Sequence, residues 1–201
     1  MLEAADLHCE RSGRTLFRGL SFALREGELL RIAGANGAGK TSLLRILCGL
    51  LEPVAGEVAW KGTPIGALKE DYAKDLVYVG HAAALKDELT AQENLSVACA
   101  LGGEIRDRSN IISALERLRV PSGIFVKRLS QGQRRRALLA RLVLSEARPL
   151  WLLDEPFAAL DTEAARTVED LVAAHTARGG MVVYTSHQES RMAGRELKLD
   201  A

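Results

Sequence analysis

A glycine-rich stretch beginning at Gly34 has the composition of a phosphate-binding loop. It matches the pattern G-x-x-x-x-G-K-[ST] at every fixed position. Glycines let the backbone approach phosphate oxygens and take positive φ, so that successive N–H groups point inward. We expect Lys40 to reach the β- and γ-phosphates of a nucleotide and the Thr41 hydroxyl to bind Mg²⁺. The predicted nucleotide-binding residues are Gly34, Ala35, Asn36, Gly37, Ala38, Gly39, Lys40, Thr41 and Ser42.

A pair of carboxylates, Asp154 and Glu155, directly follows the apolar run 150–153. In open parallel sheets, ligands gather at the carboxyl ends of the strands. We therefore expect Asp154 to hold Mg²⁺ through water and Glu155 to act as the catalytic base that polarises the attacking water. The alternative is a solvated turn with no ligand, and the phosphate loop elsewhere in the chain counts against it.

A third polar group, LSQGQ at 129–133, lies where a helix is predicted to begin. Its Ser130 hydroxyl and Gly132 amide would lie at a positive helix end, which suits a γ-phosphate. Farther along the chain, Asp161 has the position of a helix N-cap. The basic residues after LSQGQ are predicted to form a solvated face of the helix; they are Arg134, Arg135, Arg136 and Arg141.

The elements around these residues predict a parallel sheet that would position them. The apolar run 29–33, the phosphate loop and the helical pattern 42–50 follow in the order strand, loop, helix. The runs 150–153 and 181–184 are apolar throughout, as in strands buried on both faces, and a helix is expected between them over 162–177. Such a strand order favours an α/β fold with a phosphate-loop NTPase core.

Two further parts are predicted around that core. Segments 2–9, 20–24 and 56–60 are expected to form a small antiparallel β layer. Between 90 and 145 helical spacing dominates, and helices are predicted at 111–120 and 131–144. We expect one domain over 1–201, with a helical subdomain at about 84–147.

Composition excludes several other classes of protein. The chain has 201 residues, 47% of them hydrophobic, which suits a single globular domain. Its 27 basic and 26 acidic residues leave a net charge of +1, so no nucleic-acid partner is expected. No run approaches the roughly 18 apolar residues that a membrane span requires.

Taken together, the motifs resemble the ATP-binding subunits of ABC transporters over essentially the whole chain. The resemblance is carried by GANGAGKT, LSQGQ, LWLLDEP, AALD and a late His187. It implies a head-to-tail dimer that binds ATP and Mg²⁺ and hydrolyses ATP. In it, the signature residues Ser130, Gln131, Gly132 and Gln133 of one copy would complete the phosphate site of the other copy.

The resemblance also assigns roles to single residues and exposes departures. His187 would be the catalytic switch histidine that contacts the γ-phosphate, and Asp161 would belong to the D-loop. His81 stands where the family has a glutamine that touches Mg²⁺ and couples to the membrane subunit, so it is the expected equivalent. Gln131 replaces a glycine, and the segment 11–13 lacks the aromatic residue that stacks on adenine.

These departures resemble one branch, the CcmA family of the cytochrome c maturation system. CERSGRTLF, YVGH, LSQGQRRRALLARL and PLWLLDEPFAALD carry this resemblance. It implies an ATPase that powers haem export or delivery for c-type cytochromes. The expected location is peripheral, at the cytoplasmic face of the bacterial inner membrane or at the equivalent organelle membrane, with a permease subunit resembling CcmB as partner. Haem itself would be contacted only indirectly.

Two other functions stay open. The same ATPase chemistry would serve an ABC transporter with another substrate, which neighbouring genes would distinguish. A soluble ABC ATPase acting on DNA or ribosomes is an alternative of a different class. A long coiled-coil insert or a tandem nucleotide domain would favour it, and the sequence contains neither.

Overall fold

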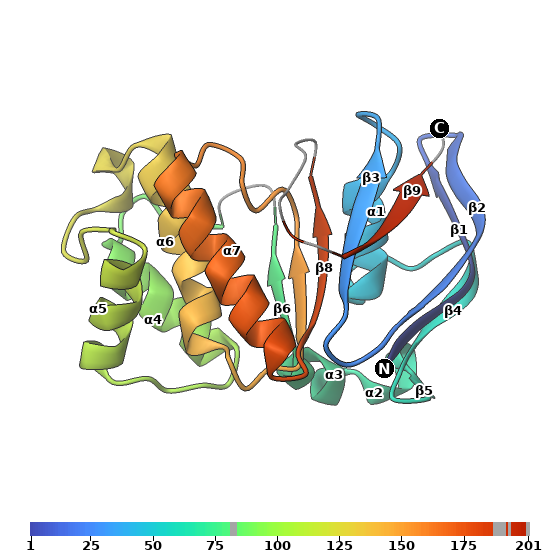
Figure 1. Ribbon diagram of the computed structural model, residues 1–201, viewed down its shortest axis with the longest axis horizontal. Coiled ribbons are helices and arrows are strands. Elements are labelled where there is room, and N and C mark those ends of the chain that lie inside the picture. The colour runs from blue at the N-terminus through green and yellow to red at the C-terminus, as the bar shows by residue number, and fades with distance from the viewer. Residues whose placement is uncertain (81–83, 187–191, 193, 200–201) are drawn as a thin grey trace.

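The computed structural model describes residues 1–80, 84–186, 192 and 194–199, and it contains two β-sheets with helices packed around them (Figure 1). The strands are β1 (Leu2–Arg11), β2 (Arg14–Leu24), β3 (Leu29–Gly34), β4 (Ala55–Trp60), β5 (Thr63–Pro64), β6 (Leu76–Val79), β7 (Leu150–Leu153), β8 (Met181–Thr185) and β9 (Arg195–Leu199). The helices are α1 (Lys40–Leu47), α2 (Ile65–Leu68), α3 (Glu70–Asp75), α4 (Ala91–Leu101), α5 (Arg108–Arg117), the 3₁₀ helix η1 (Val126–Arg128), α6 (Gln131–Leu144) and α7 (Thr162–Ala177).

The larger sheet is parallel and has the strand order β6-β7-β8-β3-β9. The smaller sheet is antiparallel, in the order β2-β1-β4-β5. Figure 1 shows α1 between the two sheets and α4, α5 and α6 together beyond the other side of the parallel sheet. The predicted fold class, an α/β core with an antiparallel layer and a helical part, is confirmed.

Strand β7 explains why the central strands are apolar throughout. Successive side chains of a strand point to opposite faces. Leu150 and Leu152 pack with α1 and the antiparallel sheet, whereas Trp151 and Leu153 pack with the helices of the other side. Both faces of the parallel sheet are therefore buried, and the sheet separates two hydrophobic cores.

The sequence predicted some element bounds well and others poorly. Helices α6 and α7 and strand β7 have the predicted bounds. Helix α1 ends at Leu47, earlier than predicted, because Gly49 takes φ 73° and Leu50 N–H donates to Arg45 O, which closes the helix with a left-handed turn. Strand β9 was not predicted, because its sequence RELKL alternates with charged residues.

Candidate functional site

The predicted phosphate loop joins β3 to α1 and opens into a hollow of about 640 Å³. Gly39, the residue before the helix, takes φ 101°, and a Cβ there would lie 3.0 Å from Leu16 Cβ. At Gly34, a Cβ would lie 2.8 Å from the carbonyl oxygen of Leu199. Only glycine fits both positions, so the loop backbone can follow the path that a phosphate cradle requires.

Lys40, the first residue of α1, points back into this loop. Its Nζ donates to Gly34 O at 2.8 Å and to Ala35 O at 2.9 Å. Burial lowers the pKa of Lys40, and the nearby carboxylates of Glu155 and Asp154 act in the opposite direction. The loop carbonyls thus hold the ammonium inside the loop, and its third N–H donor could bind an anion there.

Asp154 lies at the bottom of the hollow and is 1% exposed. Thr41 Oγ1 donates to Asp154 Oδ2 at 2.9 Å, and Thr185 Oγ1 donates to Asp154 Oδ1 at 2.8 Å. Three neighbouring strands therefore deliver their carboxyl ends to one point, as expected of an open parallel sheet. The structure brings together Thr41 and Asp154, the two residues predicted to hold Mg²⁺.

Thr185 is a site residue that the sequence did not reveal. Besides donating to Asp154, its Oγ1 accepts a hydrogen bond from Glu155 N–H at 2.8 Å. It is the last residue of β8 and is completely buried. Its position at the end of an apolar strand, two residues before His187, was the available signal.

Glu155 lines the same hollow in a backbone conformation that is unusual for a residue with a Cβ. Its φ is 50°, in the left-handed region. Such conformations persist only where the surroundings enforce them, and they concentrate at functional sites. Here the Thr185 hydroxyl holds the Glu155 amide.

The antiparallel sheet also contributes to the lining of this hollow. Arg11, Ser12 and Leu16 line it, and among the described residues its lining includes no aromatic side chain. This agrees with the absence of an adenine-stacking residue around 11–13 in the sequence.

The two predicted histidines, His81 and His187, lie outside the described residues. Asp161 is described, and its side chain accepts a hydrogen bond from Ala164 N–H at 2.8 Å. It is therefore the N-cap of α7, as its position in the sequence indicated.

The signature residues form a capping box at the start of α6. Ser130 Oγ accepts from Gln133 N–H at 3.2 Å, while Gln133 Oε1 accepts from Ser130 N–H at 2.9 Å. Ser130 and Gln131 are exposed. A Cβ at Gly132 would lie 2.9 Å from the carbonyl oxygen of Ala159, so a larger residue would push the helix away from that turn. The lining of the phosphate-loop hollow, as far as the structure describes it, includes no signature residue.

The prediction that the arginines of α6 form a solvated face was wrong for Arg135. This side chain is buried, at 6% exposure, and its guanidinium donates to the carbonyl oxygens of Gly80, Asp154 and Glu155. Arg134 is partly exposed and pairs with Asp87 at 2.8 Å. Periodicity placed these residues on one helix but could not show that strand-end carbonyls would face one of them.

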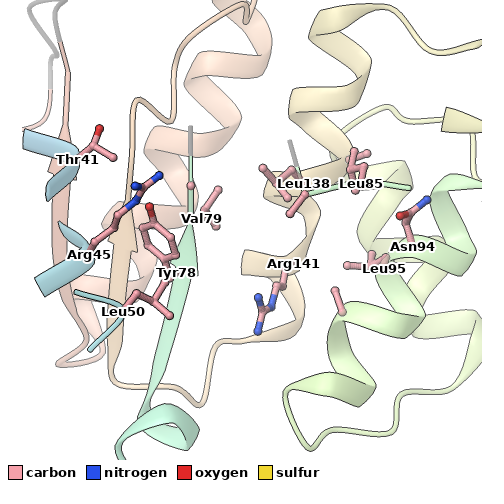
Figure 2. A pocket seen from close by; sticks show the side chains of 14 residues that line it. Thr41, Arg45, Leu50, Tyr78, Val79, Leu85, Asn94, Leu95, Leu138 and Arg141 are labelled. Atoms are coloured by element: carbon pink, nitrogen blue, oxygen red, sulfur yellow. The ribbon is translucent and has the colours of Figure 1, made fainter. Parts of the chain in front are cut away.

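A second hollow, also of about 640 Å³, lies between the core and the helical part (Figure 2). Arg45 and Tyr78 approach it from the core, and Leu138 and Arg141 from α6. Its lining is mainly apolar, with two guanidinium groups. Gly80, directly before His81, is also in the lining.

Comparison with known proteins agrees with this geometry. The family model described as ABC transporter matches residues 17–158. A cytochrome c biogenesis ATP-binding export protein, CcmA, from Aromatoleum aromaticum is 50% identical over 202 residues, covering 100% of this chain and 94% of the relative. A protein of the same name from Dechloromonas aromatica is 51% identical over 204 residues, covering 99% and 100%.

Two solved structures show the same fold. A putative ABC transporter ATP-binding protein from Pyrococcus furiosus has a TM-score of 0.85 at 24% identity, covering 98% of this chain and 96% of that chain. A dimeric ATP-binding cassette in a post-hydrolysis state, bound to ADP and Pi, has a TM-score of 0.81 at 23% identity, covering 94% and 88%. From its motifs, its fold and these relatives, the chain belongs to the ABC transporter family, in the branch of the CcmA cytochrome c biogenesis ATP-binding export proteins.

Proposed function

We propose that this chain is the ATP-hydrolysing subunit of an ABC transporter complex that supplies energy for c-type cytochrome biogenesis. The observation that carries the ATPase function is the convergence of Lys40, Thr41 and Asp154 beside Glu155 beyond the carboxyl ends of the parallel strands β3 and β7. The relatives named for cytochrome c biogenesis support the pathway.

The hollow fits the phosphates of ATP and a Mg²⁺ ion. Amide groups of the loop and Lys40 would bind the phosphates, and the oxygens of Thr41 and Asp154 suit a hard cation that prefers oxygen ligands. The described residues contain no cluster of three or more His, Cys, Asp or Glu side chains able to hold a metal. A Mg²⁺ ion here would therefore rely on phosphate and water for its other ligands, and when bound it neutralises phosphate charge.

The chemistry of this chain centres on Glu155. Its carboxylate would accept a proton from the attacking water, because water is a poor nucleophile toward a phosphoryl group. Thr185 fixes the Glu155 backbone and Asp154 at the same time, so it would hold the base at a constant distance from the metal ligand. His187 would orient the water at the γ-phosphate.

A second copy of the chain would complete the site. The start of α6 combines a positive helix end with the exposed Ser130, but it lies outside the hollow that holds the phosphate loop of the same chain. Ser130, Gln131, Gly132 and Gln133 of one copy would therefore bind the γ-phosphate held by the other. The dimeric form of a similar cassette supports this arrangement.

A membrane subunit resembling CcmB would dock at the second hollow, which lies between the core and the helical subdomain of residues 84–147. That subdomain would move as one unit. The apolar lining and the guanidinium groups of Arg45 and Arg141 suit an amphipathic helix that carries acidic residues. Among the described residues, no helix has the length and apolarity to cross a bilayer. The relatives named as cytochrome c biogenesis export proteins support a location at the cytoplasmic face of the inner membrane, where the chain would act through its partner and contact haem only indirectly.

Complementation tests this function directly. The chain, expressed with its own membrane partner, is expected to restore haem-stained c-type cytochromes to a bacterium whose corresponding ATPase gene has been deleted. Glu155→Gln is expected to fail, with turnover lowered by about 10²- to 10⁴-fold because the base is lost. Normal cytochromes with the glutamine variant would refute the role of Glu155. Failure of the unaltered chain, despite normal ATPase activity, would refute the cytochrome pathway.

A further inference from the structure

Arg135 connects three parts of the molecule through one side chain. It belongs to α6, the helix that begins with the signature residues. Its Nη1 donates to Gly80 O at 2.8 Å, and its Nη2 donates to Asp154 O at 2.6 Å and to Glu155 O at 2.8 Å. The guanidinium therefore lies between the helical part and the carboxyl ends of β6 and β7.

The hydrogen bonds of Arg135 are expected to be strong, because the donor is charged and buried. Hydrogen bonds from a charged donor are shorter and stronger than neutral ones, and they gain further strength where water is excluded. Burial lowers the pKa of Arg135, while the carboxylates of Asp154 and Glu155 raise it. A planar guanidinium can reach several carbonyls at fixed angles, which neither lysine nor glutamine can do.

Two of the accepting carbonyls belong to the carboxylate pair itself. Glu155 takes a positive φ, so its peptide groups need partners in directions that an ordinary strand end would not provide. Thr185 holds the amide side of Glu155, and Arg135 holds the carbonyl side. The backbone of the catalytic base is therefore fixed at both ends, one of them by the signature helix.

We propose that Arg135 is a positioning residue that couples the position of the catalytic Glu155 carboxylate to the position of α6, the helix that begins with the signature residues. The proposal rests on the function assigned above to Glu155 and to the start of α6. When the nucleotide of a second copy draws Ser130 towards it, the shift of α6 reaches Glu155 through the Arg135 guanidinium. The same side chain carries the shift to Gly80, directly after β6.

A buried arginine that only stabilises the fold is the competing explanation. The test compares Arg135→Met and Arg135→Lys with Arg108→Met, a control that removes an exposed guanidinium from α5. For each full-length chain, in complex with its membrane partner, kcat and KM for MgATP are measured together with the melting temperature. A purely structural role predicts a lower melting temperature with unchanged kcat per folded molecule.

We expect Arg135→Met to lower kcat by about 100-fold and to change KM less than about threefold, because a displacement of about 1 Å of a catalytic group has this effect. Arg135→Lys should recover part of the loss, since it keeps a charged hydrogen-bond donor but concentrates it on one nitrogen. Arg108→Met should match the unaltered chain. Should the methionine variant not fold, the lysine variant decides, and an unchanged kcat in it overturns the proposal.

Combining the variants shows whether Arg135 acts through Glu155. If it does, Arg135→Met should lower single-turnover hydrolysis no further once Glu155→Gln is present, whereas independent roles would multiply the two losses. Multiplied losses overturn the Arg135 proposal and leave the proposed function intact. Undiminished turnover in Glu155→Gln alone overturns the proposed function, and with it any role of Arg135 through that carboxylate.

Discussion

The polar residues at the phosphate loop contact one another, whereas those at the start of α6 face outward. Thr41, Asp154 and Thr185 are joined by hydrogen bonds and are largely withdrawn from solvent. At the signature, Ser130 and Gln131 are exposed, and the Ser130 side chain and amide form hydrogen bonds with Gln133 at the start of the same helix. The first region is organised by hydrogen bonds within the chain, whereas the second exposes side chains at the surface. The proposed dimer accounts for this difference.

Among the changes that compare these two regions, the largest effect is expected from one at the start of α6. Aspartate is as good an N-cap as serine, so Ser130→Asp should keep α6 stable, but it would place a carboxylate against the neighbour's γ-phosphate. We expect turnover to fall by about 100-fold, as when a phosphate-stabilising group is lost at an active site.

Two measurements check this variant. Its melting temperature should remain that of the unaltered chain, and a fluorescent ATP analogue should bind the monomer with unchanged affinity. If ATP-dependent dimers form normally and turnover is unchanged, Ser130 does not contact a phosphate, and the contrast between the two regions needs another explanation.

A pH titration tests how much the packing of α7 against β7, the strand that leads to Asp154, contributes to stability. His175 on α7 is buried and stacks on Trp151 of β7, with ring centroids 3.8 Å apart. Its pKa is lowered from 6.5 to about 4, first by burial and then by Arg178. The unfolded chain therefore binds the proton more readily, so stability is full above pH 6.5 and is lost as the pH falls towards 4.

The total loss should be on the order of 3 kcal/mol, from the size of the pKa change. Denaturant unfolding between pH 7 and pH 4 measures it. His175→Phe keeps a flat ring against Trp151 and removes the titration, so its curve should be flatter in this range. An equally steep curve in the phenylalanine variant would assign the acid sensitivity to other groups.

A smaller loss of stability than the one from His175 is expected for Thr185→Val, which keeps the shape of the side chain and removes the hydroxyl. Asp154 loses a donor and the Glu155 amide loses its acceptor, and we expect a destabilisation of about 2 kcal/mol. Turnover should fall with little change in KM, because the base is no longer held. Thr185→Ser keeps the hydroxyl and serves as control. Equal stability of all three proteins would show that the inner region is less preorganised than its hydrogen bonds suggest.

The sequence predicted elements whose pattern is local and missed features that depend on distant segments. Helix α7 and strand β7 have periodic or fully apolar sequences, so their bounds were predicted correctly. The apolar signal of β9 is interrupted by Arg195, Glu196 and Lys198, and its position follows only from pairing with β3.

The same distinction holds within the site. The phosphate loop and the carboxylate pair are continuous motifs, so a single sequence suffices to propose them. The burial of Arg135 depends on carbonyls from two other segments, and the role of Thr185 depends on the two carboxylate residues that follow the neighbouring strand β7. No spacing rule within α6 or β8 contains this information.

The position of the parallel sheet between the two hydrophobic cores has a practical consequence for redesign. Neighbouring residues of β7 pack into different hydrophobic cores: Leu150 and Leu152 into one, Trp151 and Leu153 into the other. Substitutions in one core can therefore be made without changing the side chains that fill the other. The helical half could be rebuilt to accept a foreign permease while the nucleotide half keeps its own packing. The limit to such a graft is Arg135, since any new helix must return a guanidinium to the same three carbonyls.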